Sequence, residues 1–359
     1  KVARSGPLPS SSSSSSSPPM ACRASNVVAC GVASGRGSCG GGGGSIGLHL
    51  RPLAGRTRAR GFAVLAHHWA GGPSQGASGS VDGQRQRVCV LLHGILGSKS
   101  NWNTPARRLL TRIGPLGWRI LQLDHRAHGQ SPAGEAPHTM EACAADVLET
   151  LLAAGVEPER DELVVCGHSF GGKVALAVLR SLLESGTPPP RTTWLFDSMP
   201  GRPAPRSTEE ERAEQSVSFV LGVVEAAASP GLYADRSALV DALASEHGLA
   251  KPLAQWVAQG VKPSACGGGV RLGYDMGAVR AMYDSYQATD MWQVLEAGTA
   301  DIGIVVAGRN RRAWGDENLS RLDALRDRRV QTAVLEGAGH NVHVDDLPGL
   351  LKVVEPSFV

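Results

Sequence analysis

Short apolar runs alternate with amphipathic stretches along most of the chain, beginning at about Phe62. The apolar runs have the length and composition of buried strands, and they fall at residues 88–92, 118–123, 163–166, 193–196, 302–306 and 330–335. The amphipathic stretches read as helices at residues 104–113, 140–154, 171–183, 317–326 and 347–354. This alternation predicts an α/β fold with a mostly parallel, doubly wound sheet that is covered by helices on both faces.

Residues 201–295 interrupt the alternation. They contain helical pieces at 210–224, 237–247 and 276–286 and a glycine run at 267–269, but no strand-like run. A helical insertion between two strands is expected to form a cap over the carboxyl edge of the sheet, where open α/β sheets bind ligands. The predicted organisation is therefore a first part of the core at 61–200, a helical cap at 201–295 and a second part of the core at 296–359.

The first 60 residues have a different composition. They contain a serine run at 10–17, a glycine run at 40–44, several arginines, and no aromatic or acidic residue. Such a stretch buries too little apolar area to offset its chain entropy, so we expect it to be disordered. An Arg-rich, Ser-rich and acid-free N-terminal segment is typical of an organelle transit peptide. The alternative is a disordered tail without a targeting role.

The distribution of charge excludes one class of partner. Eight of the 36 basic residues precede Asp82, the first acidic residue, so the rest of the chain has 28 bases against 33 acids and a net charge of about −5. A nucleic-acid-binding protein needs its positive charge on the folded body, where it can displace counterions from phosphates. We therefore expect no nucleic-acid partner. No apolar run approaches about eighteen residues, so no transmembrane segment is predicted either.

The seven cysteines form no recognisable ligand set. The sequence contains neither a CxxC pair nor an HExxH motif, so no metal site is predicted. An odd number of cysteines in a chain of this length is typical of free or buried thiols in a reducing compartment.

The segment Gly167-His168-Ser169-Phe170-Gly171 lies directly after a predicted strand and directly before a predicted helix. This is the GxSxG pattern in the strand–turn–helix context that it requires, in which the glycines permit a sharp turn that exposes the serine hydroxyl. Ser169 is therefore the predicted nucleophile of a nucleophile elbow.

A serine hydroxyl needs a base within hydrogen-bond reach. His340 follows the last predicted strand and comes after the nucleophile in the chain, which is the order that this architecture uses for its histidine. His343 is a neighbouring competitor. We expect His340 to be the base.

The negative charge that develops on an acyl intermediate needs backbone N–H donors. The first predicted donor is the amide of Phe170, just after the nucleophile. The second comes from the loop after the strand at 88–92, where Ile95 follows His93 and Gly94.

These residues, in this order and spacing, resemble the α/β-hydrolase superfamily from about Phe62 to the C-terminus. More narrowly, the chain resembles the group around the α/β-hydrolase domain-containing protein 11, which includes plastid-type relatives in plants and algae. The likeness rests on residues 93–98, 101–102, 124–131, the elbow, the cap segments at 268–271 and 282–286, and the Gly339-His340 pair. The resemblance implies a capped hydrolase without a cofactor. It also implies a chloroplast or other plastid location, with the mitochondrion as the alternative.

The sequence departs from the commonest pattern at the acid of the catalytic triad. Many relatives place an aspartate just after the strand that follows the cap, but the loop at 307–314 has an arginine there. Asp197, at the end of the strand before the cap, can take the role instead. This arrangement resembles that of some esterases of the narrower group. Asp316 is the alternative acid, and Asp197 is otherwise a non-catalytic residue at a strand end.

The predicted function is a serine hydrolase of the esterase, lipase or thioesterase type, which cleaves a small-molecule carboxylic ester or thioester. Ser169 forms the acyl-enzyme, His340 moves the proton, and Asp197 orients the imidazole. Water completes the cycle, so no cofactor is predicted. Two alternatives remain open at this stage, namely carbon–carbon bond hydrolysis or lyase chemistry on the same triad, and ligand binding with little turnover. Acyl length, head group and oligomeric state are left open.

Overall fold

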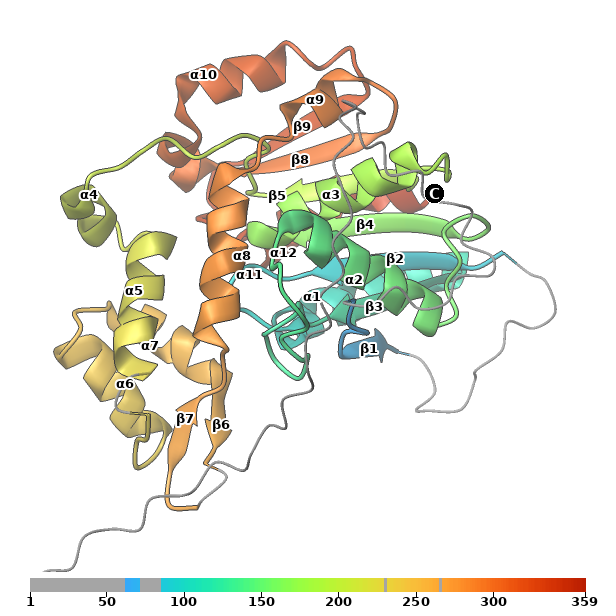
Figure 1. Cartoon of the computed structure of the whole chain (residues 1–359). Helices are drawn as coiled ribbons and strands as arrows, with labels where there is room; N and C mark the ends of the chain where they lie inside the picture. The colour runs from blue at the N-terminus through green and yellow to red at the C-terminus, as the bar shows by residue number, and fades with distance from the viewer. Residues whose placement is uncertain (1–61, 72–84, 229–230, 265–266) are drawn as a thin grey trace, which may run out of the picture. The chain divides into compact units, whose positions relative to one another are not determined.

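The computed structural model describes residues 62–71, 85–228, 231–264 and 267–359 (Figure 1). All of them belong to one of the two compact units of the chain, His49–Val359. The predicted disordered head at 1–60 lies outside the described residues.

A seven-stranded sheet with the order β1-β3-β2-β4-β5-β8-β9 forms the centre of this unit. The six predicted strands are confirmed, as β2 (Arg87–Leu92), β3 (Trp118–Leu123), β4 (Glu162–His168), β5 (Thr192–Phe196), β8 (Ile302–Ala307) and β9 (Val330–Leu335). These six pair in parallel. β1 (His67–Ala70) pairs with β3 in the antiparallel sense, and the sequence did not predict it. It is a short, partly exposed edge strand, so it lacks the apolar run by which buried strands are recognised.

The core is divided between the two faces of the sheet. Val88, Val90 and Leu92 of β2 belong to one apolar cluster, whereas Cys89 and Leu91 belong to the other. Successive side chains of a strand point to opposite faces, so the continuous apolar runs of the sequence supply both clusters. This confirms the prediction of a sheet that is covered on both sides.

Helices cover both faces. The core helices are α1 (Asn103–Ile113), α2 (Met140–Ala153), α3 (Phe170–Glu184), α10 (Arg311–Asp323), α11 (Val342–Asp345) and α12 (Leu347–Val354), with 3-10 turns η1 (Lys99–Trp102), η2 (Gly114–Leu116), η4 (Gly308–Asn310) and η5 (Glu355–Phe358). α2 and α3 contribute to the first apolar cluster, and α1 and α12 contribute to the second. α10 begins six residues before the predicted start at 317, and it is interrupted at Gly315, whose φ of 70° is not helical.

The segment between β5 and β8 forms the cap, which differs from the prediction in two ways. Its elements are α4 (Thr208–Ala213), α5 (Val217–Ala228), α6 (Arg236–Ser245), α7 (Lys251–Val257), η3 (Ala258–Gly260), β6 (Val261–Pro263), β7 (Val270–Leu272), α8 (Met276–Ala288) and α9 (Trp292–Glu296). The prediction of an all-helical cap was wrong, because β6 and β7 form an antiparallel hairpin whose three-residue strands are too short to give a periodic signal. The single helix predicted at 210–224 is two helices, because Gln215 has a φ of 52°. None of the helices in the described part of the chain is long and apolar enough to cross a bilayer.

Lys173 joins the cap to the core. Its ammonium lies on α3 and donates hydrogen bonds to the carbonyls of Gly201 (2.8 Å), Tyr286 (2.8 Å) and Thr289 (3.1 Å). Gly201 is at the entrance of the cap segment, and the other two are near its exit, beside and within α8. Figure 1 shows α8 between the sheet and the group of α5, α6 and α7. Burial lowers the pKa of Lys173 to about 7. One side chain therefore fixes both ends of the insertion.

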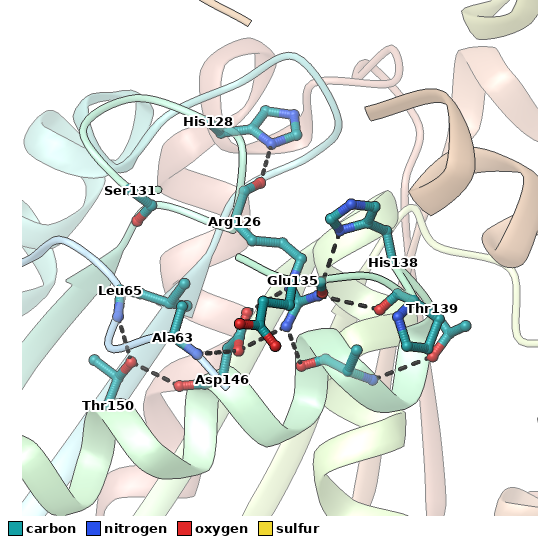
Figure 2. A network of polar contacts seen from close by, with 12 residues as sticks. Ala63, Leu65, Arg126, His128, Ser131, Glu135, His138, Thr139, Asp146 and Thr150 are labelled. Carbon is teal, nitrogen blue, oxygen red and sulfur yellow. Dashed lines mark hydrogen bonds and ion pairs between the residues drawn. The ribbon is translucent and has the colours of Figure 1, made fainter. Parts of the chain in front are cut away.

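A buried ion pair fixes the loop that follows β3 (Figure 2). Arg126 Nε and Nη2 donate to the two carboxylate oxygens of Asp146, on α2, at 2.6 and 2.8 Å. Both side chains are almost fully buried. Asp146 also accepts a hydrogen bond from the amide of Ala63, and the neighbouring Thr150 accepts one from the amide of Leu65. The segment before β1 and the loop after β3 are therefore held on the same helix.

Removal of the Asp146 carboxylate is expected to destabilise the fold strongly. Asp146→Ala leaves the Arg126 guanidinium buried without its counterion, which typically costs about 3–5 kcal/mol in the free energy of unfolding. The control is Asp301→Ala, because Asp301 and Arg329 form an ion pair of which about half is exposed, and exposed pairs contribute about 0–1 kcal/mol. Urea unfolding of the two variants measures both losses. Equal losses would contradict the role assigned to the buried pair.

Candidate active site

Four loops at the carboxyl edge of the sheet contain residues in an unusual backbone conformation. One such residue lies after each of the strands β2, β3, β4 and β5. They are Leu96, Ala127, Ser169 and Asp197, with φ values of 58°, 59°, 52° and 43°. Residues with a side chain seldom adopt positive φ, and the conformation persists only where surrounding contacts impose it. Such residues concentrate at functional sites, so the four loops mark the candidate site.

Ser169 occupies the sharp turn between β4 and α3. Its amide donates to the carbonyl of Phe196 at 3.0 Å, which ties the turn to the end of β5. A Cβ on Gly167 would lie 2.1 Å from the carbonyl oxygen of Gly171, and a Cβ on Gly171 would lie 2.6 Å from that of His93. Both glycines are therefore required by close backbone contacts, and the predicted strand–turn–helix geometry is present at Ser169.

Asp197 and His340 are brought together from positions 143 residues apart. His340 Nδ1 is 2.8 Å from Asp197 Oδ2. The side chain of Asp197 is fully buried, whereas 38% of the His340 side chain is exposed. A carboxylate on Nδ1 favours the tautomer in which Nδ1 carries the proton, so Nε2 is left as a proton acceptor. The predicted base and the predicted acid thus form one hydrogen-bonded pair.

The Asp197 carboxylate has three further donors. Trp314 Nε1 and the amide of Ala307 donate to Oδ1 at 2.8 and 3.1 Å, and Asn310 Nδ2 donates to Oδ2 at 2.6 Å. These donors come from the end of β8 and from the segment after it, where the sequence lacks the common aspartate. The sequence analysis did not predict Asn310 and Trp314 as partners of the acid. The sequence feature that could have identified them is their position in the segment after β8, from which their N–H groups reach an acid at the end of the neighbouring strand.

The competing residues lie elsewhere. Asp316 is exposed on α10. His343 is buried on α11, where its ring lies 4.6 Å from the Trp102 ring and 4.7 Å from the His168 ring, measured between centroids. The hydrogen-bonded pair is therefore formed by His340 rather than His343 as the imidazole and by Asp197 rather than Asp316 as the carboxylate.

The predicted oxyanion donors flank Ser169. Phe170 is the first residue of α3, so its amide has no partner within the helix. Ile95 lies in a turn that is closed by the bond from the Gly97 amide to the Gly94 carbonyl, at 3.0 Å. A Cβ on Gly94 would lie 3.4 Å from Ser169 Cβ, so this turn touches Ser169. Within the described ranges, neither the Ile95 nor the Phe170 amide hydrogen-bonds to another protein group.

Asp124, directly after β3, joins two segments next to this turn. Its carboxylate accepts hydrogen bonds from the amide of Lys99 at 2.6 Å and from the amide of Gln130 at 3.0 Å. The Lys99 ammonium also contacts it at 2.5 Å. These contacts hold the start of η1 against the loop that follows β3.

Five buried histidines surround the turn and the elbow, namely His93, His125, His128, His168 and His343. Burial is the main cause that lowers the pKa of each one, to about 3 for His125, to about 4 for His128 and His343, and well below the usual range for the other two. Near neutral pH these imidazoles are therefore uncharged.

The hydrogen bonds of two of these histidines show their structural role. His93 Nε2 accepts from the amide of His125 at 3.0 Å, and its Nδ1 donates to the Gly94 carbonyl at 2.7 Å. His168 Nε2 donates to the carbonyl of His340 at 2.8 Å, which fixes the backbone of the candidate base. The neutral rings thus hold the loops of the site without adding charge.

Three comparisons with known proteins agree with this geometry. The family model described as "Alpha/beta hydrolase family" matches residues 89–350. The chain is 43% identical over 89 residues to an sn-1-specific diacylglycerol lipase ABHD11 of Xenopus laevis, which covers 25% of this chain and 26% of that protein. It is 39% identical over 87 residues to the protein of the same name from Mus musculus, with 24% and 26% covered. The chain therefore spans about a quarter of the length of the curated relatives that it matches.

A solved structure supports the fold. A marine microorganism esterase superposes with a TM-score of 0.60 and 15% identity, covering 83% of this chain and all of that one. Together with the family model, this confirms the predicted α/β-hydrolase fold. The relatives confirm the predicted resemblance to the group around the α/β-hydrolase domain-containing protein 11.

Replacement of His343 by leucine is expected to make the fold less sensitive to acid. The pKa of His343 is about 4 in the folded chain, against 6.5 for an ordinary histidine. As the pH falls below 6.5, the unfolded chain therefore takes up this proton first. Between pH 6.5 and 4 the group lowers the free energy of unfolding by up to about 1.4 kcal/mol per pH unit.

Urea unfolding between pH 4.5 and 7 measures this effect. The slope of the unfolding free energy against pH should be smaller in His343→Leu by up to about 1.4 kcal/mol per pH unit, which corresponds to one proton. The control is Val344→Ala, at the exposed neighbouring position, which removes no titratable group and should leave the slope unchanged. A slope in His343→Leu equal to that of the wild type would contradict the assignment.

Proposed function

The chain belongs to the alpha/beta hydrolase family, and on that premise we propose that it is a serine hydrolase that cleaves carboxylic esters or thioesters. The observation that carries the proposal is the hydrogen bond between His340 Nδ1 and the buried Asp197 carboxylate, beside the strained turn at Ser169. A base oriented by a carboxylate next to a serine on an elbow is the arrangement that activates a hydroxyl for acyl transfer.

The residues have distinct roles in the proposed reaction. Ser169 Oγ attacks the acyl carbonyl, and His340 Nε2 takes its proton and returns it to the leaving group. Asp197 stabilises the imidazolium that forms in between and keeps the ring in one tautomer. No hydrogen bond joins Ser169 Oγ to His340 among the described residues. That bond forms when substrate is present, as is common for catalytic contacts that are loose in free enzymes.

The intermediate carries a negative oxygen. The amides of Ile95 and Phe170 donate to it, and removal of one such donor typically costs about 10²–10³ in kcat. Water then hydrolyses the acyl-enzyme, so the chain's own residues are sufficient for each step. The name of the relatives, sn-1-specific diacylglycerol lipase, favours a lipid ester among the substrates proposed.

The acid of the triad provides the sharpest test. Asp197→Asn keeps the shape of the side chain but removes its charge and its control of the tautomer, a change that costs about four orders of magnitude in serine proteases. We expect ester hydrolysis to fall by at least about two orders of magnitude. The matched variant is Asp316→Asn, on the exposed side of α10, which should change the rate by less than about threefold.

The rates are measured with a panel of acyl esters and thioesters of graded chain length, with Ser169→Ala as the inactive reference. The far-ultraviolet circular dichroism and the melting temperature of each variant show whether its fold is intact. Residual activity in Ser169→Ala would refute the mechanism, and the reverse ranking of the two aspartates would transfer the role to Asp316. Release of alcohol from a simple ester also separates an esterase from a carbon–carbon hydrolase, and from a ligand-binding protein with little turnover.

A further inference from the structure

Leu96 is held by two side chains that come from distant parts of the chain. It is buried, its φ is 58°, and it directly follows the oxyanion donor Ile95. Its amide donates to His128 Nε2 at 3.0 Å, and its carbonyl accepts from the hydroxyl of Tyr274 at 2.7 Å. His128 belongs to the loop after β3, whereas Tyr274 belongs to the cap, 178 residues away along the chain.

The contact from the core is rigid. Figure 2 shows the ring of His128 above the backbone of Arg126, to whose carbonyl His128 Nδ1 donates at 2.9 Å. That bond places the ring proton on Nδ1 and leaves Nε2 as the acceptor for Leu96. Arg126 is itself paired with the buried Asp146. His128 therefore holds the Leu96 amide in a fixed position relative to the core.

The contact from the cap is built by the hairpin. Tyr274 follows β7, and the amide of Gly273 donates to the carbonyl of Gly260 at 2.9 Å. A Cβ on Gly260 would lie 2.1 Å from the Tyr274 hydroxyl oxygen, so the glycine leaves the space that the tyrosine occupies. Burial raises the pKa of the Tyr274 phenol, so the hydroxyl stays a proton donor. Its ring also meets the His128 ring edge-on, at 5.8 Å between centroids.

One side of the turn borders open space. A cavity of about 230 Å³ lies between the turn and the cap, and its lining includes Leu96, Gly97, Trp256, Lys262 and Tyr274. Where side chains leave such a space, hydrogen bonds rather than close packing decide the position of the backbone. The left-handed backbone conformation of a leucine costs a free energy of the same order as the stabilisation that one hydrogen bond provides. Loss of one contact is therefore enough to let the turn relax.

We infer that Tyr274 is a positioning residue for the oxyanion turn, which it holds from the cap so that the Ile95 amide points at the reacting carbonyl. The inference rests on the proposed function. In this arrangement the oxyanion site is complete only while the β6–β7 hairpin is seated on the core. The position of the cap therefore controls stabilisation of the intermediate.

The test is Tyr274→Phe in the full chain, which removes only the hydroxyl. The control is Tyr283→Phe, because the Tyr283 hydroxyl accepts a bond from Ser218 within the cap, at 3.4 Å. We expect Tyr274→Phe to lower kcat for an acyl ester by about tenfold or more, with KM changed by less than about twofold. Tyr283→Phe should change both by less than about twofold.

Inhibitor binding separates positioning from a general loosening of the fold. An alkyl boronic acid forms a tetrahedral adduct with a serine hydroxyl and places an oxygen in the oxyanion site. An ether analogue of the ester binds without such an oxygen. In Tyr274→Phe the boronic acid should bind more weakly by about the factor lost in kcat, whereas the affinity for the ether should stay within about twofold of the wild type.

Wild-type kcat and boronic-acid affinity in Tyr274→Phe would overturn the inference. Equal losses in Tyr274→Phe and Tyr283→Phe would also overturn it, because they would indicate a general loosening of the cap. A wild-type chain that neither hydrolyses esters nor binds the boronic acid would overturn the proposed function itself. The failure of the inference and the failure of the function are therefore distinguishable.

Discussion

The Asp197 carboxylate joins three parts of the chain that are far apart in sequence. Asp197 directly follows β5. Its carboxylate accepts hydrogen bonds from the end of β8, from Asn310, from Trp314 and from His340. A buried carboxylate without donors is strongly unfavourable, so the strained backbone at Asp197 is stable only when these donors arrive together. The same condition sets the position of His340 relative to the turn at Ser169. The geometry of the site thus follows from satisfying one buried charge.

The sequence predicts the parts of this site whose signals are local. Ser169 is recognised by its flanking glycines between a strand and a helix, and His340 by its place after the last strand. Asp197 is recognised as an acidic residue that closes an apolar run. These features depend on residues close together in the chain, so they are readable before the fold is known.

The remaining parts depend on contacts across the fold. Lys173 lies on a predicted helix, Tyr274 in the predicted cap and Trp314 in the predicted loop after β8. Each of them contacts a residue that is distant in sequence. The β6–β7 hairpin has strands of three residues, which give no period, and β1 is a partly exposed edge strand. The targeting role of residues 1–60 stays a prediction, because they lie outside the described residues.

The cap and the core meet through specific polar contacts. Lys173 fixes the two ends of the cap segment, and Tyr274 fixes its hairpin to the turn beside the nucleophile. The buried histidines hold the loops as neutral groups, so no fixed cation among them competes with the charges that develop in the proposed reaction. The site therefore combines a hydrogen-bonded carboxylate at Asp197, uncharged histidines that hold the loops, and a cap that contacts the turn at Leu96.

The central claim is that Ser169 carries the acyl group between the two halves of the proposed reaction. The most direct measurement is the intact mass of the protein, quenched in acid within milliseconds to seconds of mixing with a p-nitrophenyl acyl ester. The account predicts a mass increase of one acyl group, located by peptide mapping on the peptide that contains Ser169. Two outcomes would contradict the account. One is a burst of released nitrophenol without an acyl adduct on the protein, and the other is an adduct on a residue other than Ser169.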